Sequence, residues 1–129
     1  MEILGWVVTG IAALLLLMQG TMWLQSRRAQ GRLAPDTHAV DGEAATDPLR
    51  VYYFYAQHCG HCRATTPLVA RLRADYRNLI QLDIADNREL ARAFGVMATP
   101  SFIQVSNGVI RHVKLGAQNE AQVRALLQP

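Results

Sequence analysis

The first part of the chain is uniformly apolar over a long stretch. The segment Ile3–Leu24 contains no charged residue and includes the apolar run Leu14–Met18. At about 1.5 Å per residue, roughly 22 helical residues match a hydrocarbon core of about 30 Å. Trp6 and Trp23 lie near the two ends, where tryptophan favours the membrane–water interface. The pattern predicts a transmembrane anchor at residues 1–25, which makes the lipid bilayer a partner of this chain.

A cleaved signal peptide is the alternative for this segment. No basic region precedes the apolar run, the run is longer than the about 7–15 residues of a signal-peptide core, and no A-x-A site follows it. We therefore expect an uncleaved single-pass anchor in a bacterial-type inner (cytoplasmic) membrane. Arg27, Arg28 and Arg32 follow the span, so the positive-inside rule favours a domain that faces the cytoplasm. A periplasmic domain is the alternative.

Residues 26–48 follow neither the helical nor the strand period. They contain Gly31, Pro35, Gly42 and Pro48 together with four acidic residues. This composition is typical of a loop or linker. We expect a flexible linker that tethers a domain at residues 49–129.

The remainder alternates between strand-like and helix-like patterns. Strands are rich in β-branched and aromatic residues, and the helices carry apolar residues at helical spacing. The predicted elements are a strand at Val51–Tyr55, a helix at about Cys62–Tyr76, a strand at Leu79–Ile84, a helix at Asn87–Phe94 that Gly95 ends, a hairpin of Ser101–Val105 and Val109–Val113, and a last helix with Val123, Leu126 and Leu127 on its apolar face. The order β-α-β-α-β-β-α places the domain in the α/β class.

The amino-acid composition excludes several classes of protein. Half of the 129 residues are hydrophobic, which excludes a disordered chain, and two cysteines exclude a disulfide-rich scaffold. The net charge of +3 comes from 13 basic and 10 acidic residues, with Lys114 the only lysine. Basic runs interleaved with aromatic residues are not found, so we expect no nucleic-acid partner.

The candidate chemistry lies between the first strand and its helix. Cys59 precedes the predicted helix, where unpaired backbone N–H groups and the helix dipole stabilise a thiolate. The thiolate is the attacking species in disulfide exchange. Cys62 lies one turn further on and is positioned to attack a mixed disulfide. His61 would favour the Cys59 thiolate further if it carried a proton or donated a hydrogen bond.

Two other uses of this cysteine pair are alternatives. A structural disulfide that closes so short a loop contributes little, on the order of 2 kcal/mol. A metal-binding or metal-delivery module would use both cysteines with His58 and His61, but a structural zinc site needs further ligands, and only His38 and His112 remain elsewhere. We expect no metal and no cofactor other than the redox-active disulfide Cys59–Cys62.

The segment from about Val51 to Gln128 resembles the thioredoxin superfamily. The motifs that carry the resemblance are Phe54-Tyr55-Ala56, Cys59-Gly60-His61-Cys62, Pro67 within the helix, Phe94-Gly95-Val96, Thr99-Pro100-Ser101, Asn107-Gly108 and Gly116-Ala117. The resemblance implies a minimal thioredoxin fold and a protein-disulfide oxidoreductase that takes part in cell redox homeostasis. It also implies protein or small-thiol disulfide substrates and a thiol partner that donates or accepts electrons.

The resemblance assigns roles to individual residues. It implies a cis peptide bond before Pro100, which lies against the two cysteines, and a Thr99 backbone that pairs with an extended substrate. Met97 is a further candidate for substrate contact, with core packing as its alternative. His58 and the pair Gly60-His61 are expected to tune the dithiol.

The chain departs from the thioredoxin pattern at several positions. Tyr53 occupies the place of a buried acid that is assigned to proton transfer in thioredoxins, and Gln81 replaces a nearby lysine. The Gly60-His61 pair resembles protein disulfide isomerases, which implies a more oxidising couple, nearer about −180 mV than about −270 mV. In the cytoplasm such a couple acts as a disulfide reductase. An extracytoplasmic disulfide donor, isomerase or cytochrome-maturation reductase is the alternative.

Overall fold

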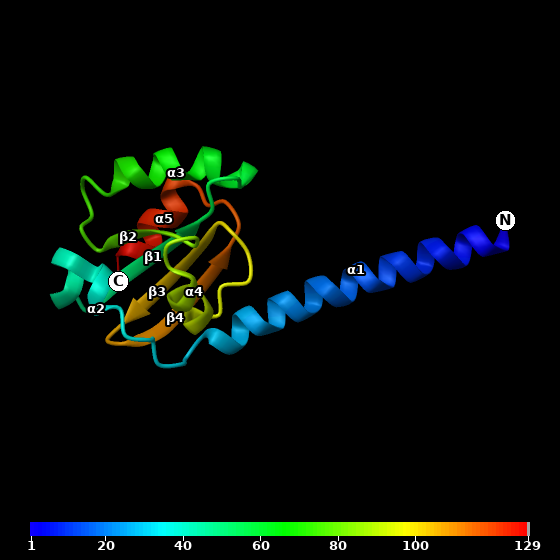
Figure 1. Ribbon diagram of the computed structural model, residues 1–129, viewed down its shortest axis with the longest axis horizontal. Helices are drawn as coiled ribbons and strands as arrows, with labels where there is room; N and C mark the ends of the chain where they lie inside the picture. Colours follow the sequence, from blue (N-terminus) through cyan, green and yellow to red (C-terminus); the bar gives the residue numbers. More distant parts are fainter. Residues whose placement is uncertain (129) are drawn as a thin grey trace.

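The computed structural model describes residues 1–128, in which a long helix leads into a small α/β domain (Figure 1). The predicted domain boundary at residue 129 falls on Pro129, which lies outside the described residues. The elements are α1 (Glu2–Ala29), α2 (His38–Asp41), the 3-10 helix η1 (Gly42–Thr46), β1 (Leu49–Tyr55), α3 (Gly60–Leu72), β2 (Leu79–Asp83), α4 (Arg88–Phe94), β3 (Ser101–Ser106), β4 (Val109–Leu115) and α5 (Glu120–Leu127).

The predicted strands form one mixed sheet within the described residues, in the order β2-β1-β3-β4. β1 pairs in parallel with β2 and antiparallel with β3, and β4 continues the sheet antiparallel to β3. The parallel pair requires a crossover connection, which α3 supplies. The expected β-α-β-α-β-β-α order of the domain is therefore confirmed.

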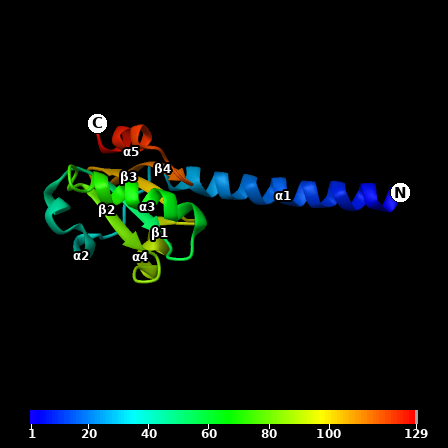
Figure 2. The same cartoon turned by 90° about the horizontal axis from the view of Figure 1, so that it is seen from above.

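Helices cover both faces of the sheet (Figure 2). Successive side chains of β1 point to opposite faces, as the strand period requires. Val51 and Tyr53 pack with residues of α3 and α5, whereas Tyr52 and Phe54 pack with Phe94 of α4. The predicted apolar face of α5 is buried as expected. Val123, Leu126 and Leu127 pack in the same hydrophobic core cluster as Val51 and Tyr53 of β1.

Two turns have the backbone conformation that their residues favour. α4 ends at Gly95, which is left-handed with a φ of 76°. Asn107 and Gly108 join β3 to β4 with φ angles of 51° and 78°. Glycine and asparagine adopt positive φ more readily than other residues, which is why Asn-Gly connects tight hairpins.

The first domain helix differs from its prediction at both ends. α3 begins at Gly60 rather than Cys62, and it ends at Leu72 rather than Tyr76. The carbonyl of Leu72 accepts from the N–H groups of both Asp75 and Tyr76, so the chain leaves the helix as a turn. Tyr76 nevertheless packs on the same core cluster, and this is why the apolar spacing continues beyond the helix.

Part of the segment 26–48, predicted as a flexible linker, has regular secondary structure. α1 continues to Ala29, and α2 and η1 form within this segment. Asp41 is buried because its carboxylate binds Arg50 at 2.5 Å and accepts a 2.6 Å hydrogen bond from the Tyr52 hydroxyl. The acidic residues of this segment therefore do not all face water, and α2 is fixed against β1.

A second contact fixes the beginning of the same segment. Residues 31–34 lie antiparallel to the edge strand β4, with a bridge between Leu33 and Val109. Gly31 N–H donates to Ile110 O at 2.7 Å, and Ile110 N–H donates to Arg32 O at 2.9 Å. These bonds occupy donors and acceptors that an edge strand otherwise leaves unpaired.

The apolar helix α1 has the length and composition of a membrane span over Glu2–Gln25. Its 24 residues correspond to about 36 Å, slightly more than a hydrocarbon core of about 30 Å. Nearly all of its large apolar side chains are exposed in the isolated chain, among them Leu14–Met18. This finding agrees with the predicted span by length and composition.

Candidate active site

The two cysteines lie at the beginning of α3. Cys59 is the N-cap residue, with extended backbone, and its Sγ accepts a hydrogen bond from the Cys62 N–H at 3.3 Å. Cys62 lies in the first turn and is buried, with 2% of its surface exposed, while Cys59 is partly exposed. Both are free thiols. One cysteine of the pair is therefore partly accessible and the other is buried.

The loop before β3 closes over the dithiol. The Thr99–Pro100 peptide bond is cis, and the Cys59 Sγ donates to the Thr99 carbonyl over 3.5 Å. Pro100 is buried, and its carbonyl accepts from the Gly116 N–H at 2.8 Å. Thr99 therefore contacts the Cys59 sulfur, and the hydrogen bond of Pro100 joins this loop to the end of β4.

The two thiols have opposite shifts in pKa. Hydrogen bonding from the Cys62 side chain, assisted by Thr99 and by the backbone N–H groups of Cys62 and His61, lowers the pKa of Cys59. Burial raises the pKa of Cys62, and the neighbouring Cys59 adds to this effect. Thiolate character is thus concentrated on the accessible sulfur, where an attacking nucleophile is needed.

Tyr53 occupies the core beneath this pair. It is fully buried in β1, and its hydroxyl lies 2.9 Å from the Thr66 hydroxyl of α3. Burial raises the pKa of Tyr53 to about 12, and the nearby Cys62 contributes to the increase. The phenol is therefore protonated near neutral pH and does not supply the base that a buried carboxylate would. Gln81 lies opposite Tyr53 on β2.

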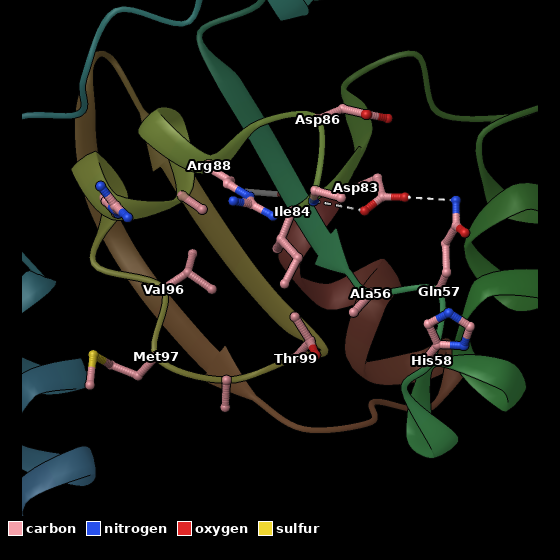
Figure 3. A pocket seen from close by; sticks show the side chains of 14 residues that line it. Ala56, Gln57, His58, Asp83, Ile84, Asp86, Arg88, Val96, Met97 and Thr99 are labelled. Carbon is pink, nitrogen blue, oxygen red and sulfur yellow. Dashed lines mark hydrogen bonds between the residues drawn. The ribbon is translucent and has the colours of Figure 1, made fainter.

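A groove of about 660 Å³ opens beside the dithiol (Figure 3). His58, Met97 and Thr99 line it, as do residues of α4. Met97 is 49% exposed, so the structure favours a surface position over core packing for this side chain. The groove offers a mixed apolar and polar surface next to the reactive sulfur.

Sequence reasoning missed two residues of this groove. The buried Asp83 at the end of β2 accepts a 3.2 Å hydrogen bond from the Gln57 side chain and a 2.9 Å bond from the Ala85 N–H. Figure 3 shows the Gln57 bond beside His58. Gln57 precedes Cys59 by two residues, so this bond ties the active-site loop to the sheet. The only sequence signal is one acid at the end of an apolar strand.

The residues expected to tune the dithiol lie at the surface of the domain. His58, Gly60 and His61 are all exposed. The His61 contribution to the Cys59 thiolate comes from its backbone N–H. Among residues 1–128, no group of three or more His, Cys, Asp or Glu side chains is arranged to hold a metal ion.

Comparisons with known proteins agree with this arrangement. The sequence model of the thioredoxin family matches residues 37–129. Thioredoxin of Echinococcus granulosus is 33% identical over 72% of this chain and 88% of its own length. Thioredoxin of Pseudomonas aeruginosa is 28% identical over 64% of this chain and 79% of its own length.

Solved structures give the same result. A mutant thioredoxin from Halobacterium salinarum superposes with a TM-score of 0.61 at 25% identity, over 74% of this chain and 84% of that chain. Reduced thioredoxin of Schistosoma mansoni gives 0.58 at 30% identity, over 66% and 81%. Thioredoxins exchange thiols and disulfides with protein substrates and need no cofactor beyond their cysteine pair, here Cys59 and Cys62. The chain belongs to the thioredoxin family and has thiol–disulfide oxidoreductase activity.

Proposed function

We propose that this chain is a membrane-tethered disulfide reductase in which Cys59 is the nucleophile and Cys62 the resolving cysteine. The observation that carries the proposal is the N-cap position of Cys59, whose sulfur accepts the Cys62 N–H. Such a position stabilises the thiolate, which is the species that attacks a substrate disulfide. The lowered pKa of Cys59 and the burial of Cys62 support this division of roles.

The reaction transfers two electrons from the dithiol to a substrate disulfide. The Cys59 thiolate attacks one substrate sulfur, which forms a mixed disulfide and releases the other substrate sulfur as a thiolate that takes up a proton. Cys62 then loses its proton, and its thiolate attacks the Cys59 sulfur. This second step forms the Cys59–Cys62 disulfide and releases the reduced substrate. An external thiol or dithiol partner restores the reduced pair.

The neighbouring residues hold the substrate and tune the pair. Thr99 and Pro100 position the substrate backbone beside Cys59, and Met97 contacts its side chains. His58 and His61, together with Gly60, set how readily the pair is oxidised. The contact between the Cys59 sulfur and the Thr99 carbonyl supports this assignment.

Substrate trapping tests the proposed roles. A Cys62→Ser variant of the full chain retains the nucleophile but cannot resolve, so it should accumulate mixed disulfides through Cys59. The matched control is Cys59→Ser, which should accumulate none. Equal trapping by the two variants, or none by either, would contradict the assignment. If neither variant traps a substrate, and both lack a stoichiometric metal ion that the native chain binds, the metal-delivery module would be favoured.

The membrane anchor is part of the proposal. Residues 1–25 would form the anchor, residues 26–48 the connection and residues 49–129 the catalytic domain, with the domain in the cytoplasm of a bacterial-type cell. The length and apolar composition of α1 and the arginines that follow it support this placement. Resistance of the full chain to alkaline extraction, and a variant without residues 1–25 that becomes extractable, would test tethering.

Orientation has its own test. A membrane-impermeant thiol reagent applied to intact spheroplasts should not label Cys59 when the domain is cytoplasmic. Rapid labelling of Cys59 from outside would place the domain in the periplasm. That result would favour the second candidate, an extracytoplasmic disulfide donor, isomerase or cytochrome-maturation reductase. The Gly60-His61 pair supports this candidate because it is expected to make the couple more oxidising.

A further inference from the structure

The anchor and the active site lie at the same end of the domain. α1 continues almost directly into residues that are hydrogen-bonded to β4, since Gln30 alone separates Ala29 from the bonded Gly31. The domain is therefore held against the end of the helix and does not hang from a long tether. This close attachment gives the domain a defined orientation relative to the membrane.

The last turns of α1 overlap the end of β4. Gln19, Met22 and Trp23 of α1 line a hollow together with Val113, Lys114 and Leu115 of β4. These three helix residues lie two to six positions before the end of the apolar stretch at Gln25, or about 3 to 9 Å along the helix axis. The stretch of about 36 Å exceeds the hydrocarbon core by about 6 Å, so with this excess at the C-terminal end of α1, Met22 and Trp23 and the end of β4 beside them lie at the level of the headgroups.

The end of β4 leads directly to the reactive cysteine. Leu115 pairs with Ser101, the Gly116 N–H donates to the Pro100 carbonyl, and the Thr99 carbonyl accepts from the Cys59 thiol. Figures 1 and 2 both show the end of β1 and the beginning of α3 on the side of the domain toward which α1 extends. The beginning of α3, which carries the dithiol, therefore lies on the same side of the domain as the anchor.

We infer that the substrates of this site are membrane proteins whose disulfides lie at the bilayer surface. The inference rests on the membrane tethering proposed above. A dithiol fixed at headgroup level meets such a disulfide at high effective concentration, whereas a disulfide far from the surface meets it at a lower one. Met97 is exposed and lines the groove beside Cys59, so a substrate segment that reaches this end of the domain can contact it.

A pair of model substrates tests the inference with the full chain in lipid vesicles. Each substrate is a single transmembrane peptide with one disulfide. In the proximal substrate the disulfide directly follows the span, and in the distal substrate it lies beyond a flexible spacer of about 40 residues. The reduced chain should reduce the membrane-proximal disulfide about tenfold faster than the distal one. Equal rates, or faster reduction of the distal disulfide, would overturn the inference.

The matched control releases the helix without disturbing the domain. A flexible insertion of about 20 residues between Gln30 and Gly31 leaves residues 31–34 paired with β4 but separates α1 from the domain. This variant should lose the preference for the proximal disulfide while reducing a small water-soluble disulfide at the rate of the native chain. Failure of both proteins to reduce any disulfide would instead contradict the proposed function.

Lys114 allows a direct measurement of how close the end of β4 lies to the bilayer. It is the only lysine, it is exposed, and it lies beside the end of α1, so an amine-reactive fluorophore reports on that position. Nitroxide lipids labelled near the headgroup should quench the probe in the native chain but not in the chain with the insertion. Lys114→Arg, labelled in the same way, corrects for dye on the N-terminal amine. Absence of quenching in the native chain would contradict the placement.

Discussion

The sulfur of Cys59 lies 3.3 Å from the backbone nitrogen of Cys62 and accepts its hydrogen bond. This donor is one of the N–H groups that the first turn of a helix leaves without an intrahelical partner. A charged acceptor forms a stronger bond with it than a neutral one, so the arrangement favours the thiolate over the thiol. The Cys59 sulfur is therefore activated for nucleophilic attack before any substrate binds.

The Cys62 side chain should control how readily Cys59 ionises. Its hydrogen bond is the largest contribution that lowers the pKa of Cys59. Cys62→Ser retains a hydroxyl donor, whereas Cys62→Ala has none and should raise the pKa of Cys59. Alkylation rates measured against pH should therefore have a midpoint below 9.0 in the serine variant and a higher midpoint in the alanine variant. Coincident midpoints would exclude this role for the side chain.

The lowered pKa of Cys59 also predicts how stability changes with pH. A group whose pKa is lower in the folded state contributes stability above its unfolded pKa, and this contribution is lost as the pH falls through the folded value. In the Cys62→Ser variant Cys59 is the one remaining thiol, so its contribution to the free energy of unfolding, measured by urea denaturation, should decrease as the pH decreases from about 9. Cys59→Ala/Cys62→Ser should lack that decrease.

Replacement of Tyr53 by phenylalanine should affect stability more than catalysis. The phenol is protonated at neutral pH because its pKa is raised to about 12, chiefly by burial. Loss of its bond to Thr66 should lower the free energy of unfolding by about 1 kcal/mol, while the rate of disulfide reduction stays within about twofold. A large loss of activity with unchanged stability would show that the Tyr53 hydroxyl takes part in proton transfer.

Tyr53 has a second effect at alkaline pH. Its raised folded pKa contributes stability that is present below the unfolded value of about 10 and is lost as the pH approaches about 12. The native chain should therefore lose more stability above about pH 10 than Tyr53→Phe does.

The buried carboxylate of Asp41 should be essential for the fold of the segment before β1. Its side chain is 3% exposed and binds Arg50, Tyr52 and Thr37. Asp41→Ala would leave the Arg50 charge buried without a partner, which destabilises proteins by about 3–5 kcal/mol. Thermal or urea denaturation measures this loss. Asp47→Ala, which removes only the exposed ion pair with Arg77, should have a small effect.

The sequence predicts the elements whose pattern is local. The apolar spacing of Val123, Leu126 and Leu127 is sufficient to place α5, and Gly95 is sufficient to end α4, because both signals act within a few residues. The active-site pair is predictable for the same reason, since its chemistry depends on the spacing of Cys59 and Cys62 along one helical turn.

The features that the sequence does not predict depend on distant partners. Asp41 resembles the exposed acids around it until Arg50 and Tyr52 are brought beside it. The attachment of residues 31–34 to β4 uses backbone groups, which every residue has, so it leaves no side-chain signal. The bond from Gln57 to Asp83 crosses from the active-site loop to β2 and requires the fold to be known.

The most direct test of the central claim is the redox equilibrium of the full chain. The purified protein in detergent micelles is equilibrated with graded glutathione buffers, and the free thiols are alkylated and counted by mass. A reversible two-electron transition of Cys59 and Cys62 between about −180 and about −230 mV is expected, since the Gly60-His61 pair and the stabilised Cys59 thiolate favour the reduced form. Thiols that show no reversible transition in any buffer would contradict the account.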